Sequence, residues 1–277
     1  INGVLGARLT KDIIRSGAMP VVRLENVFRQ AQLSPIVRNA HRINQGLMPL
    51  VDGDTDFTFR QFMNEEETVR YVVDTYARMV RTLSWQNVQV LSPMHRNPCG
   101  VENLNRLLQA RVNPPSPDKA EHKAGNTVYR EGDKVMQIRN DYDIVLKNPD
   151  GTTAGTGVYN GDVGQITAID PQTETLAVCY DGKTATYGFE MLNELEHAWV
   201  MTVHKSQGSE YRAVVLALGR GAPQLMTRGV LYTAVTRARE LLIAVGREET
   251  ADQMIENHRQ SRRYSGLRVR LCAGLGA

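Results

Sequence analysis

The length, composition and charge of the chain are those of an ordinary globular protein. It has 277 residues, 42% of them hydrophobic and 23% charged, and 33 basic against 30 acidic side chains leave a formal charge of +3. These values exclude intrinsic disorder and fibrous folds, and at roughly 100 to 200 residues per domain the chain has room for one or two domains. No apolar run approaches the roughly 18 residues of a membrane span, so we expect a soluble, cytoplasmic protein with no membrane partner.

The cysteines and the first residue lead to two more expectations. The three cysteines, Cys99, Cys179 and Cys272, have neither CxxC nor Cys/His ligand spacing, which favours free thiols over metal ligands. The chain starts at Ile1 and its first methionine is Met19, which predicts a piece of a longer protein.

Helix signals and short apolar runs alternate over the first part of the chain. A helix is predicted from its N-cap Ser34 to Gly46, and a second helix from its N-cap Asn64. A buried strand over 88–91 and a helix from Val101 follow. This alternation is typical of an α/β layer.

The pattern changes between Thr127 and Glu190. Turn signals there separate short predicted strands at 135–138, 163–169, 176–180 and 184–187. They predict a small β module, a barrel of the SH3-like kind. The α/β pattern then returns, with strands at 199–203, 213–218 and 241–245 and a helix over 230–238. The β module is therefore predicted to be an insertion in an α/β domain, and the basic stretch 258–270 a solvated tail.

Two segments carry most of the polar chemistry. Residues 199–211, WVMTVHKSQGSEY, predict a strand that runs into a polar loop, whose hydroxyl, imidazole, ammonium and backbone N–H groups suit phosphates or a nucleic-acid backbone. Residues 231–239, LYTAVTRAR, predict a helix from which Arg237 projects. A fixed guanidinium of this kind can neutralise a transferring γ-phosphoryl group. A surface ion pair is the alternative for Arg237, and the spacing alone leaves it open.

These segments and two others resemble helicase motifs. TVHKSQGSEY resembles motif V of superfamily 1 helicases, and LYTAVTRAR resembles their motif VI. LENVFRQA at 24–31 is similar to the FRQ-containing motif IV, and VLSPM at 90–94 to the strand and loop upstream of the β module. GDKVMQ at 132–137, RNDY at 139–142 and YNGDVG at 159–164 resemble the start of the SH3-like domain called 2B in RecD-like helicases.

The resemblance covers about Gly17 to Gly246 and implies an α/β fold. A RecA-like, P-loop-NTPase-type domain with a parallel sheet, called 2A, would comprise residues 1–126 and 196–277. Residues 127–195 would contain the inserted SH3-like β-barrel 2B, with a core at about 155–190.

Carried over residue by residue, the resemblance also implies a nucleotide site and a DNA path. The implied nucleotide-site residues are Arg29 and Arg237 as catalytic groups at the γ-phosphate, with Gln30, Gly208 and Glu210 binding the nucleotide. The implied DNA-binding residues are Ser92, Pro93, Met94, Asn140, Thr202, His204 and Lys205.

Several of these residues have structural alternatives. A structural ion pair is the alternative for Arg29, a solvated carboxylate for Glu210, and a satisfied structural histidine for His204. Trp199 and Tyr211 are expected to pack in the core rather than to stack on bases.

Two elements that ATP hydrolysis requires are missing from the sequence. Neither a GxxxxGK[ST] loop nor an apolar strand ending in Asp-Glu occurs. GKT at 182–184 has Ala177 in place of the first glycine, and we expect a hairpin turn there. The resemblance therefore implies that ATP and Mg²⁺ are bound together with a RecA-like domain that precedes this chain, and that Mg²⁺ is held mainly there.

The implied function is that of the second motor half of an ATP-dependent DNA helicase. It would move 5′ to 3′ on single-stranded DNA and unwind duplex in repair or recombination, with other repair proteins as further partners. The chain alone is expected to hydrolyse no ATP and to bind single-stranded DNA weakly. Two alternatives remain, the helicase half of a TraI-type conjugative relaxase and a non-catalytic interaction module with a helicase-like fold.

Overall fold

The computed structural model describes residues 13–14, 16–22, 34–51, 56–258 and 267–274. The chain divides into two compact units, one formed by residues 1–32 with 259–277 and the other by residues 33–258. Helix α7 (Leu267–Gly274) belongs to the first unit. The predicted boundaries of the α/β domain and its insertion remain predictions.

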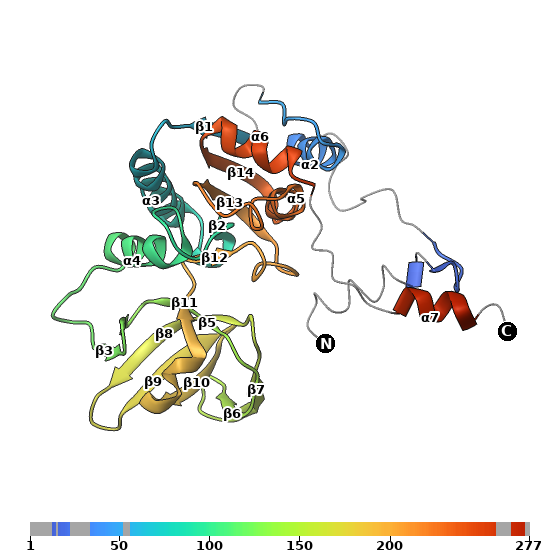
Figure 1. The fold of residues 1–277 in the computed structure, drawn as a ribbon. Coiled ribbons are helices and arrows are strands. Elements are labelled where there is room, and N and C mark those ends of the chain that lie inside the picture. Colours follow the sequence, from blue (N-terminus) through green and yellow to red (C-terminus); the bar gives the residue numbers. More distant parts are fainter. Residues whose placement is uncertain (1–12, 15, 23–33, 52–55, 259–266, 275–277) are drawn as a thin grey trace. The chain divides into compact units, whose positions relative to one another are not determined.

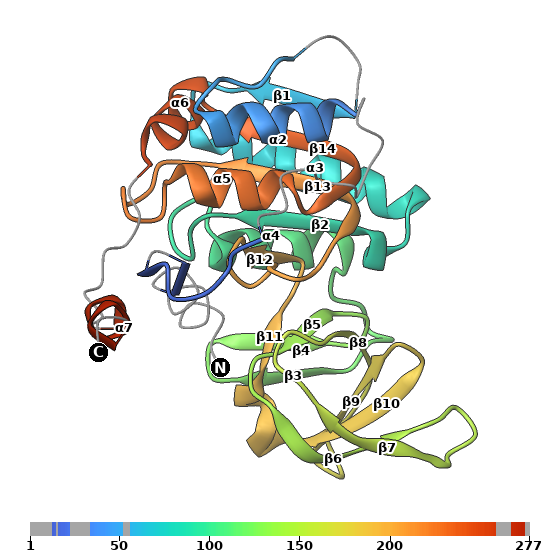
Figure 2. The ribbon, with the colours of Figure 1, turned by 90° about the vertical axis from the view of Figure 1, so that its right-hand side faces the viewer.

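Five parallel strands form one sheet of the second unit (Figure 2). Their spatial order is β1 (Phe57–Gln61), β14 (Ala238–Gly246), β13 (Tyr211–Leu218), β2 (Val88–Ser92) and β12 (Val200–Thr202). The inner strands β13 and β2 are almost entirely buried, as expected for a parallel sheet covered on both faces. In the register, Val215 pairs with Val90 on one side and with Ile243 on the other. The strands predicted at 88–91, 213–218 and 241–245 are confirmed, and β1 lies outside the predicted strands.

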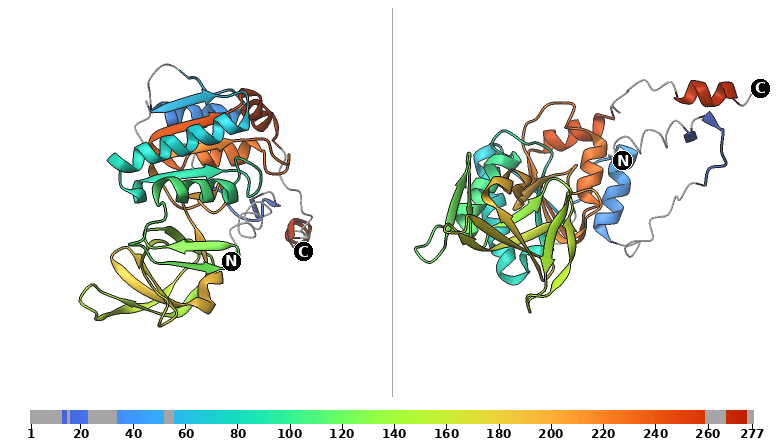
Figure 3. Two further views of the ribbon diagram at one scale, coloured as in Figure 1. Left: turned by 90° about the vertical axis from the view of Figure 1, so that its left-hand side faces the viewer. Right: turned by 90° about the horizontal axis from the view of Figure 1, so that it is seen from below.

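Helices cover both faces of this sheet (Figures 1 and 3). On one face lie α3 (Glu65–Thr82) and α4 (Val101–Val112), and on the other α2 (Pro35–Gln45) and α5 (Arg228–Val235), with α6 (Glu248–Glu256) against α5. The helix ends follow local signals. Asn64 Oδ1 accepts a hydrogen bond from the Glu67 N–H at 2.8 Å, and Gly46 takes a φ of 83° after α2. The two helices predicted from Ser34 and Asn64 are confirmed.

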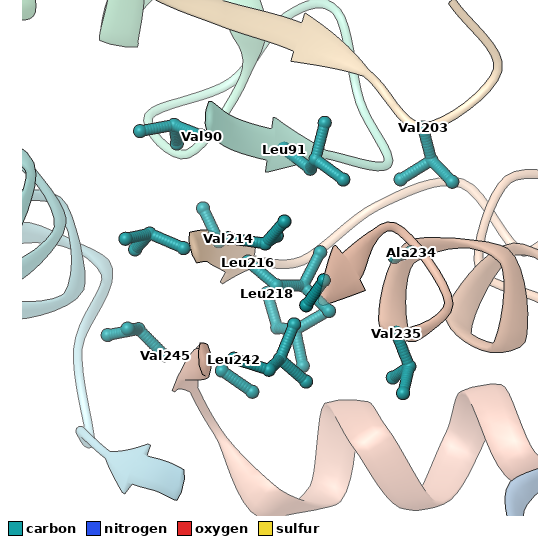
Figure 4. Close-up of a cluster of buried hydrophobic side chains, with 14 of the residues drawn as sticks. Val90, Leu91, Val203, Val214, Leu216, Leu218, Ala234, Val235, Leu242 and Val245 are labelled. Atoms are coloured by element: carbon teal, nitrogen blue, oxygen red, sulfur yellow. The ribbon is translucent and has the colours of Figure 1, made fainter. Parts of the chain in front are cut away.

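An apolar core lies between the sheet and α5 (Figure 4). Leu216 of β13 and Leu242 of β14 point into this core. They lie beside Val203, which follows β12, and Val235 of α5, and all four side chains are buried. Burial of such side chains is the main favourable contribution to folding, at about 25 cal/mol per Å² of apolar surface. The core packs the middle of β13 and β14 against α5, the helix that ends just before the candidate site.

Residues 134–197 contain a second sheet, which we call the β lobe. Its strands are antiparallel in the order β11 (Leu195–His197), β5 (Lys134–Gln137), β8 (Val163–Asp170), β9 (Thr175–Tyr180), β10 (Lys183–Gly188), β6 (Asp141–Lys147) and β7 (Thr153–Val158). It has its own buried cluster, which includes Ile166, Leu176 and Tyr187. A hairpin of β3 (Glu121–Ala124) and β4 (Thr127–Arg130) packs beside it, as does the 3₁₀ turn η2 (Phe189–Glu194).

The strands predicted at 135–138, 163–169, 176–180 and 184–187 are confirmed as β5, β8, β9 and β10. Strands β6 and β7 were outside the predicted set. β6 has Ile144 as its one fully buried side chain, and β7 contains Gly155 and Gly157, so neither shows the alternation of a half-buried strand. Both depend on their neighbours in the sheet rather than on local preference.

A buried carboxylate joins the β lobe to helix α4. Asp133, directly before β5, accepts hydrogen bonds from Gln109 Nε2 at 2.6 Å and from Asn113 Nδ2 at 2.7 Å. The same carboxylate accepts from the Arg130 backbone N–H at 2.8 Å and lies 3.0 Å from His197 Nε2. A buried carboxylate is costly unless several donors surround it, and these four partners meet that need. They connect the end of α4 to three segments of the β lobe and its hairpin.

The next residue, Lys134, ties β5 to the start of β2. Its Nζ donates to the carbonyl oxygens of Trp85 at 3.1 Å and Val88 at 3.3 Å, and to Gln89 Oε1 at 2.8 Å. The ammonium also lies 5.4 Å from the centroid of the Trp85 ring. Burial lowers the pKa of Lys134 to about 7, because these neutral partners only partly replace water around the charge.

Candidate functional site

The segment 203–210 runs from the carboxyl ends of the parallel strands, which we call the carboxyl edge, back to their amino ends, the amino edge. β12 ends at Thr202, which pairs with Ser92 at the carboxyl end of β2, whereas Tyr211 opens β13 at the opposite, amino edge. The segment between them turns compactly. The Ser206 N–H donates to the Thr202 carbonyl at 3.1 Å, and Gly208 has a φ of 97°, in the left-handed region that favours glycine.

The predicted nucleotide-site residues of the described region meet at the amino edge. Tyr211 pairs with Ala238 at the starts of β13 and β14, so Glu210 and Arg237, each one residue earlier, are neighbours. The Tyr211 N–H donates to the Arg237 carbonyl at 2.9 Å. Gly208 and Glu210 are exposed. The structure therefore brings Gly208, Glu210 and Arg237 together, as the resemblance implies, while their roles remain predictions.

Arg237 lies in a turn and not on a helix. Helix α5 ends at Val235 and β14 begins at Ala238, so the predicted helix over 230–238 is too long. The guanidinium donates from Nη1 to the Ser209 carbonyl at 2.9 Å and from Nε to the Thr233 carbonyl at 3.2 Å. Among the described residues it has no carboxylate partner, which removes the surface ion pair as an account of Arg237.

The predicted DNA-binding residues Thr202, His204 and Lys205 lie at the carboxyl end of β12 and the start of the segment 203–210. Thr202 is half-buried, and its Oγ1 accepts from the Lys205 N–H at 3.2 Å. The His204 ring is exposed and forms no hydrogen bond within the part of the chain that the structure describes, so the alternative of a satisfied structural histidine is not supported. Lys205 is exposed and ion-pairs with Glu196 of β11. The His204 ring is therefore available for a ligand, whereas the Lys205 ammonium is engaged by Glu196, and contact with DNA remains a prediction for both residues.

Ser92, Pro93 and Met94 need a correction, because all three are buried. Ser92 Oγ donates to the Cys99 carbonyl at 2.8 Å and accepts from the Met94 N–H at 3.2 Å. Met94 packs against Gly221, where a Cβ would approach its sulfur to 2.3 Å. These side chains shape the loop after β2 and cannot line a DNA path.

The exposed residues of that loop follow directly after them. His95, Arg96 and Asn97 are exposed, and the Asn97 side chain donates to the carbonyl of Arg220 at 3.2 Å, joining the loops that follow β2 and β13. Arg96 and Arg220 form no ion pair within the described ranges. These arginines were missed in the sequence, although Arg96 stands two residues beyond the VLSPM string.

Asn140 is exposed directly before β6, but both ends of its side-chain amide are engaged. Nδ2 donates to the Tyr142 hydroxyl at 3.2 Å, and Oδ1 accepts from the Asn160 N–H at 2.9 Å. Its contact with DNA remains a prediction. The structure shows that its side chain links Tyr142 to Asn160 by hydrogen bonds.

The remaining predicted residues divide into two groups. Arg29 and Gln30 lie outside the described residues. Trp199 and Tyr211 are buried, as expected, with the Trp199 ring edge-on to Tyr76 at 6.2 Å between centroids.

The described ranges contain no group of three or more His, Cys, Asp or Glu side chains that could hold a metal ion. Within the same ranges no helix is both long enough and apolar enough to cross a bilayer.

Comparison with known proteins identifies the two parts of this architecture. Residues 104–180 match the family model of the ATP-dependent RecD-like DNA helicase SH3 domain, and residues 197–245 match that of the UvrD-like helicase C-terminal domain. The chain contains a RecD-like superfamily 1 helicase C-terminal region. The predicted resemblance and the predicted fold class, a RecA-like α/β domain with an SH3-like β domain, are thereby confirmed, while the boundaries of 2A and 2B remain predictions.

Curated relatives agree with this assignment. The ATP-dependent RecD2 DNA helicase of Deinococcus radiodurans is 32% identical over 92% of this chain and 33% of its own length. The RecBCD enzyme subunit RecD of Mycolicibacterium smegmatis is 32% identical over 66% of this chain and 29% of its own. The chain thus spans about a third of the length of these RecD-like relatives.

Among solved structures, similarity is found to Pif1 helicases. The Candida albicans enzyme gives a TM-score of 0.47 at 15% identity, covering 93% of this chain and 61% of that chain. A Bacteroides Pif1 structure with ADP-AlF3 and single-stranded DNA gives 0.47 at 16% identity, covering 92% of this chain and 56% of that chain. Scores this low do not bear on the function of the RecD-like region.

Proposed function

We propose that the full-length protein is an ATP-dependent DNA helicase in which the sheet of β1, β2 and β12–β14 belongs to the second RecA-like domain, 2A, and the β lobe is 2B. It moves 5′ to 3′ along single-stranded DNA and unwinds duplex during repair or recombination. The names of the RecD-like relatives support ATP-dependent DNA unwinding, since one is called an ATP-dependent DNA helicase and the other a RecBCD subunit.

The hydrogen bond from Arg237 Nη1 to the Ser209 carbonyl carries the proposal. It fastens an arginine at the amino edge of the sheet to the segment 203–210, whose other end holds the exposed His204. The segment 203–210 therefore connects the Arg237 guanidinium, which is expected at the γ-phosphate, to His204, which is expected at the DNA backbone.

This connection gives a physical route from ATP to DNA. A guanidinium drawn toward a γ-phosphate moves the segment that it is bonded to, and the opposite end of the segment changes its position on the DNA backbone. Arg237 has N–H groups beyond the three that are engaged, because a guanidinium carries five donors. It can thus bind phosphate and keep its hold on Ser209.

ATP and Mg²⁺ enter this proposal differently. The exposed Gly208, the carboxylate of Glu210 and the guanidinium of Arg237 suit one wall of a nucleotide cleft. The described residues contain no group of three or more His, Cys, Asp or Glu side chains, and we propose that Mg²⁺ is held mainly by the preceding RecA-like domain. We propose a partner RecA-like domain of the same protein as the opposite wall, other repair proteins as further partners, and the cytoplasm as the location.

The DNA side of the proposal predicts the salt dependence of binding. In the full-length protein without nucleotide, Arg96→Ala should weaken binding of single-stranded DNA and lower the slope of log K against log salt by about 0.7, the value of one phosphate contact on a single strand. The exposed Arg96 side chain has no ion pair among the described residues, so a phosphate is its expected partner. Fluorescence anisotropy at several salt concentrations measures both quantities.

Arg212→Ala is the matched control for this variant. Arg212 is also exposed, but it lies at the amino end of β13, where its Nε donates to Glu240 Oε1 and Oε2 at 2.9 Å. Its removal should leave the affinity and the salt slope as they are. Binding that is independent of salt in the wild type would contradict the proposed DNA contact.

A further inference from the structure

The β lobe exposes a pair of tyrosines whose rings touch. Tyr142, in β6, is 63% exposed and Tyr159, directly after β7, is 47% exposed. Their ring centroids are 5.8 Å apart with an interplanar angle of 73°. These are the exposed tyrosines among the described residues, whereas Tyr180 and Tyr187 of the same lobe are buried with their hydroxyls 2.8 Å apart.

The pair is held in place by the residues around it. Asn140 donates to the Tyr142 hydroxyl and accepts from the Asn160 N–H, so it links strand β6, which carries Tyr142, to the turn that carries Tyr159. The Tyr159 ring lies over Gly157, where a Cβ would come within 3.0 Å of the hydroxyl oxygen. The Tyr159 N–H donates to Asp162 Oδ2 at 2.8 Å. The two rings are therefore preorganised in the absence of any ligand.

The charges around the pair differ from those of a phosphate site. Arg139 is exposed nearby, but so are Asp143 and Asp162. Asp162 accepts the backbone N–H described above, and Asp141 accepts from the Asp143 N–H at 2.9 Å. A ligand of this surface is recognised by the faces of the rings and not by an excess of positive charge.

We propose that Tyr142 and Tyr159 form a stacking platform for an unpaired nucleobase of single-stranded DNA, and that Asn140 positions the platform. The inference rests on the proposed function for its ligand, single-stranded DNA. An edge-to-face pair leaves ring surface exposed, and every base has a π-face that stacks on it irrespective of sequence. The platform adds to the phosphate contacts of the sheet edge and gives the strand a second point of attachment on the β lobe.

The test uses the full-length protein and a single-stranded oligonucleotide that contains one 2-aminopurine, moved through successive positions. With the wild type we expect the fluorescence to be quenched at one or two positions, where the base stacks on the platform. The double variant Tyr142→Ala, Tyr159→Ala should abolish that quenching and weaken binding at least about tenfold, the factor that one stacked base contributes. The salt slope should stay the same, because no phosphate contact is lost.

Three control variants separate stacking from other effects. Tyr159→Phe keeps both rings and the hydrogen bond from Asn140 to the Tyr142 hydroxyl, and should keep the quenching and the affinity. Val145→Ala removes an exposed apolar side chain from the same strand and should change neither. Asn140→Ala should reduce the quenching at an unchanged melting temperature, because it frees the Tyr142 ring without opening the core.

The outcomes distinguish the two proposals. Unaltered quenching and affinity in the double alanine variant, with DNA binding intact, would overturn the platform and leave the proposed function standing. A weaker affinity with a changed salt slope and no position-specific quenching would also overturn it, since the loss would then be electrostatic. Failure of the wild type to bind single-stranded DNA would overturn both.

Discussion

Replacing Arg237 with lysine in the full-length protein is expected to lower the rate of DNA-stimulated ATP hydrolysis by about a thousandfold, the lower end of what an arginine at a transferring phosphoryl group contributes. Lysine keeps the positive charge but cannot bind a phosphate and the carbonyls of Ser209 and Thr233 at once. The fall should appear in kcat more than in KM for ATP, because the contact strengthens as the phosphoryl group transfers. Steady-state hydrolysis at saturating single-stranded DNA measures both constants.

Arg239→Lys is the control in the same segment. Arg239 is an exposed residue of β14, two positions beyond Arg237, and we expect near wild-type turnover from it. If Arg237→Lys has the same turnover number as Arg239→Lys, Arg237 does not act at the transferring phosphoryl group, and its role is limited to the hydrogen bond with the Ser209 carbonyl.

Replacing Asp133 with alanine should produce the largest loss of stability. The change leaves the donors of Gln109, Asn113 and His197 without their buried acceptor. Breaking one side of such a network costs about 3–5 kcal/mol, which in a unit of this size lowers the melting temperature by roughly 10 °C. Thermal unfolding followed by circular dichroism gives the midpoint. The unfolding transition should also become less cooperative, because the β lobe loses its buried contact with α4.

Two further variants serve as comparisons, the conservative change Asp133→Asn and the exposed control Asp150→Ala. Asparagine replaces one carboxylate oxygen by an N–H group that faces other donors, so it should also destabilise strongly. Asp150 is exposed in the turn between β6 and β7, where it accepts from the Thr152 N–H and hydroxyl, and its removal should leave the midpoint almost unchanged. A midpoint of Asp133→Ala equal to that of Asp150→Ala would contradict the role of the buried junction.

Predictions that depend on local chemistry agree with the structure. The N-cap at Asn64 and the glycine at Gly46 act within one turn of chain, and the helices that they delimit are found. The apolar run of β13 is long enough to indicate a buried strand by itself. The neighbourhood of Glu210 and Arg237 follows from the pairing of β13 with β14, which motif order implies but spacing alone does not fix.

Predictions that depend on distant neighbours fail or fall short. Ser92 and Met94 look like loop residues in the sequence, yet the carbonyl of Cys99 and the close approach of Gly221 bury them. The helix over 230–238 is cut short because Ala238 joins β14 beside Tyr211. In each case tertiary contacts override the local pattern. Arg29 and Gln30 lie outside the described residues and remain predictions from the resemblance.

ATP turnover by the chain 1–277, measured beside that of the full-length protein, tests the central claim most directly. With Mg²⁺ and saturating single-stranded DNA, the full-length protein should hydrolyse ATP at a DNA-stimulated rate. The chain alone, shown by circular dichroism to be folded, should give no detectable turnover, because its sequence contains neither the phosphate-binding loop nor the Asp-Glu strand end. DNA-stimulated turnover by the chain alone would contradict its assignment as one half of the motor.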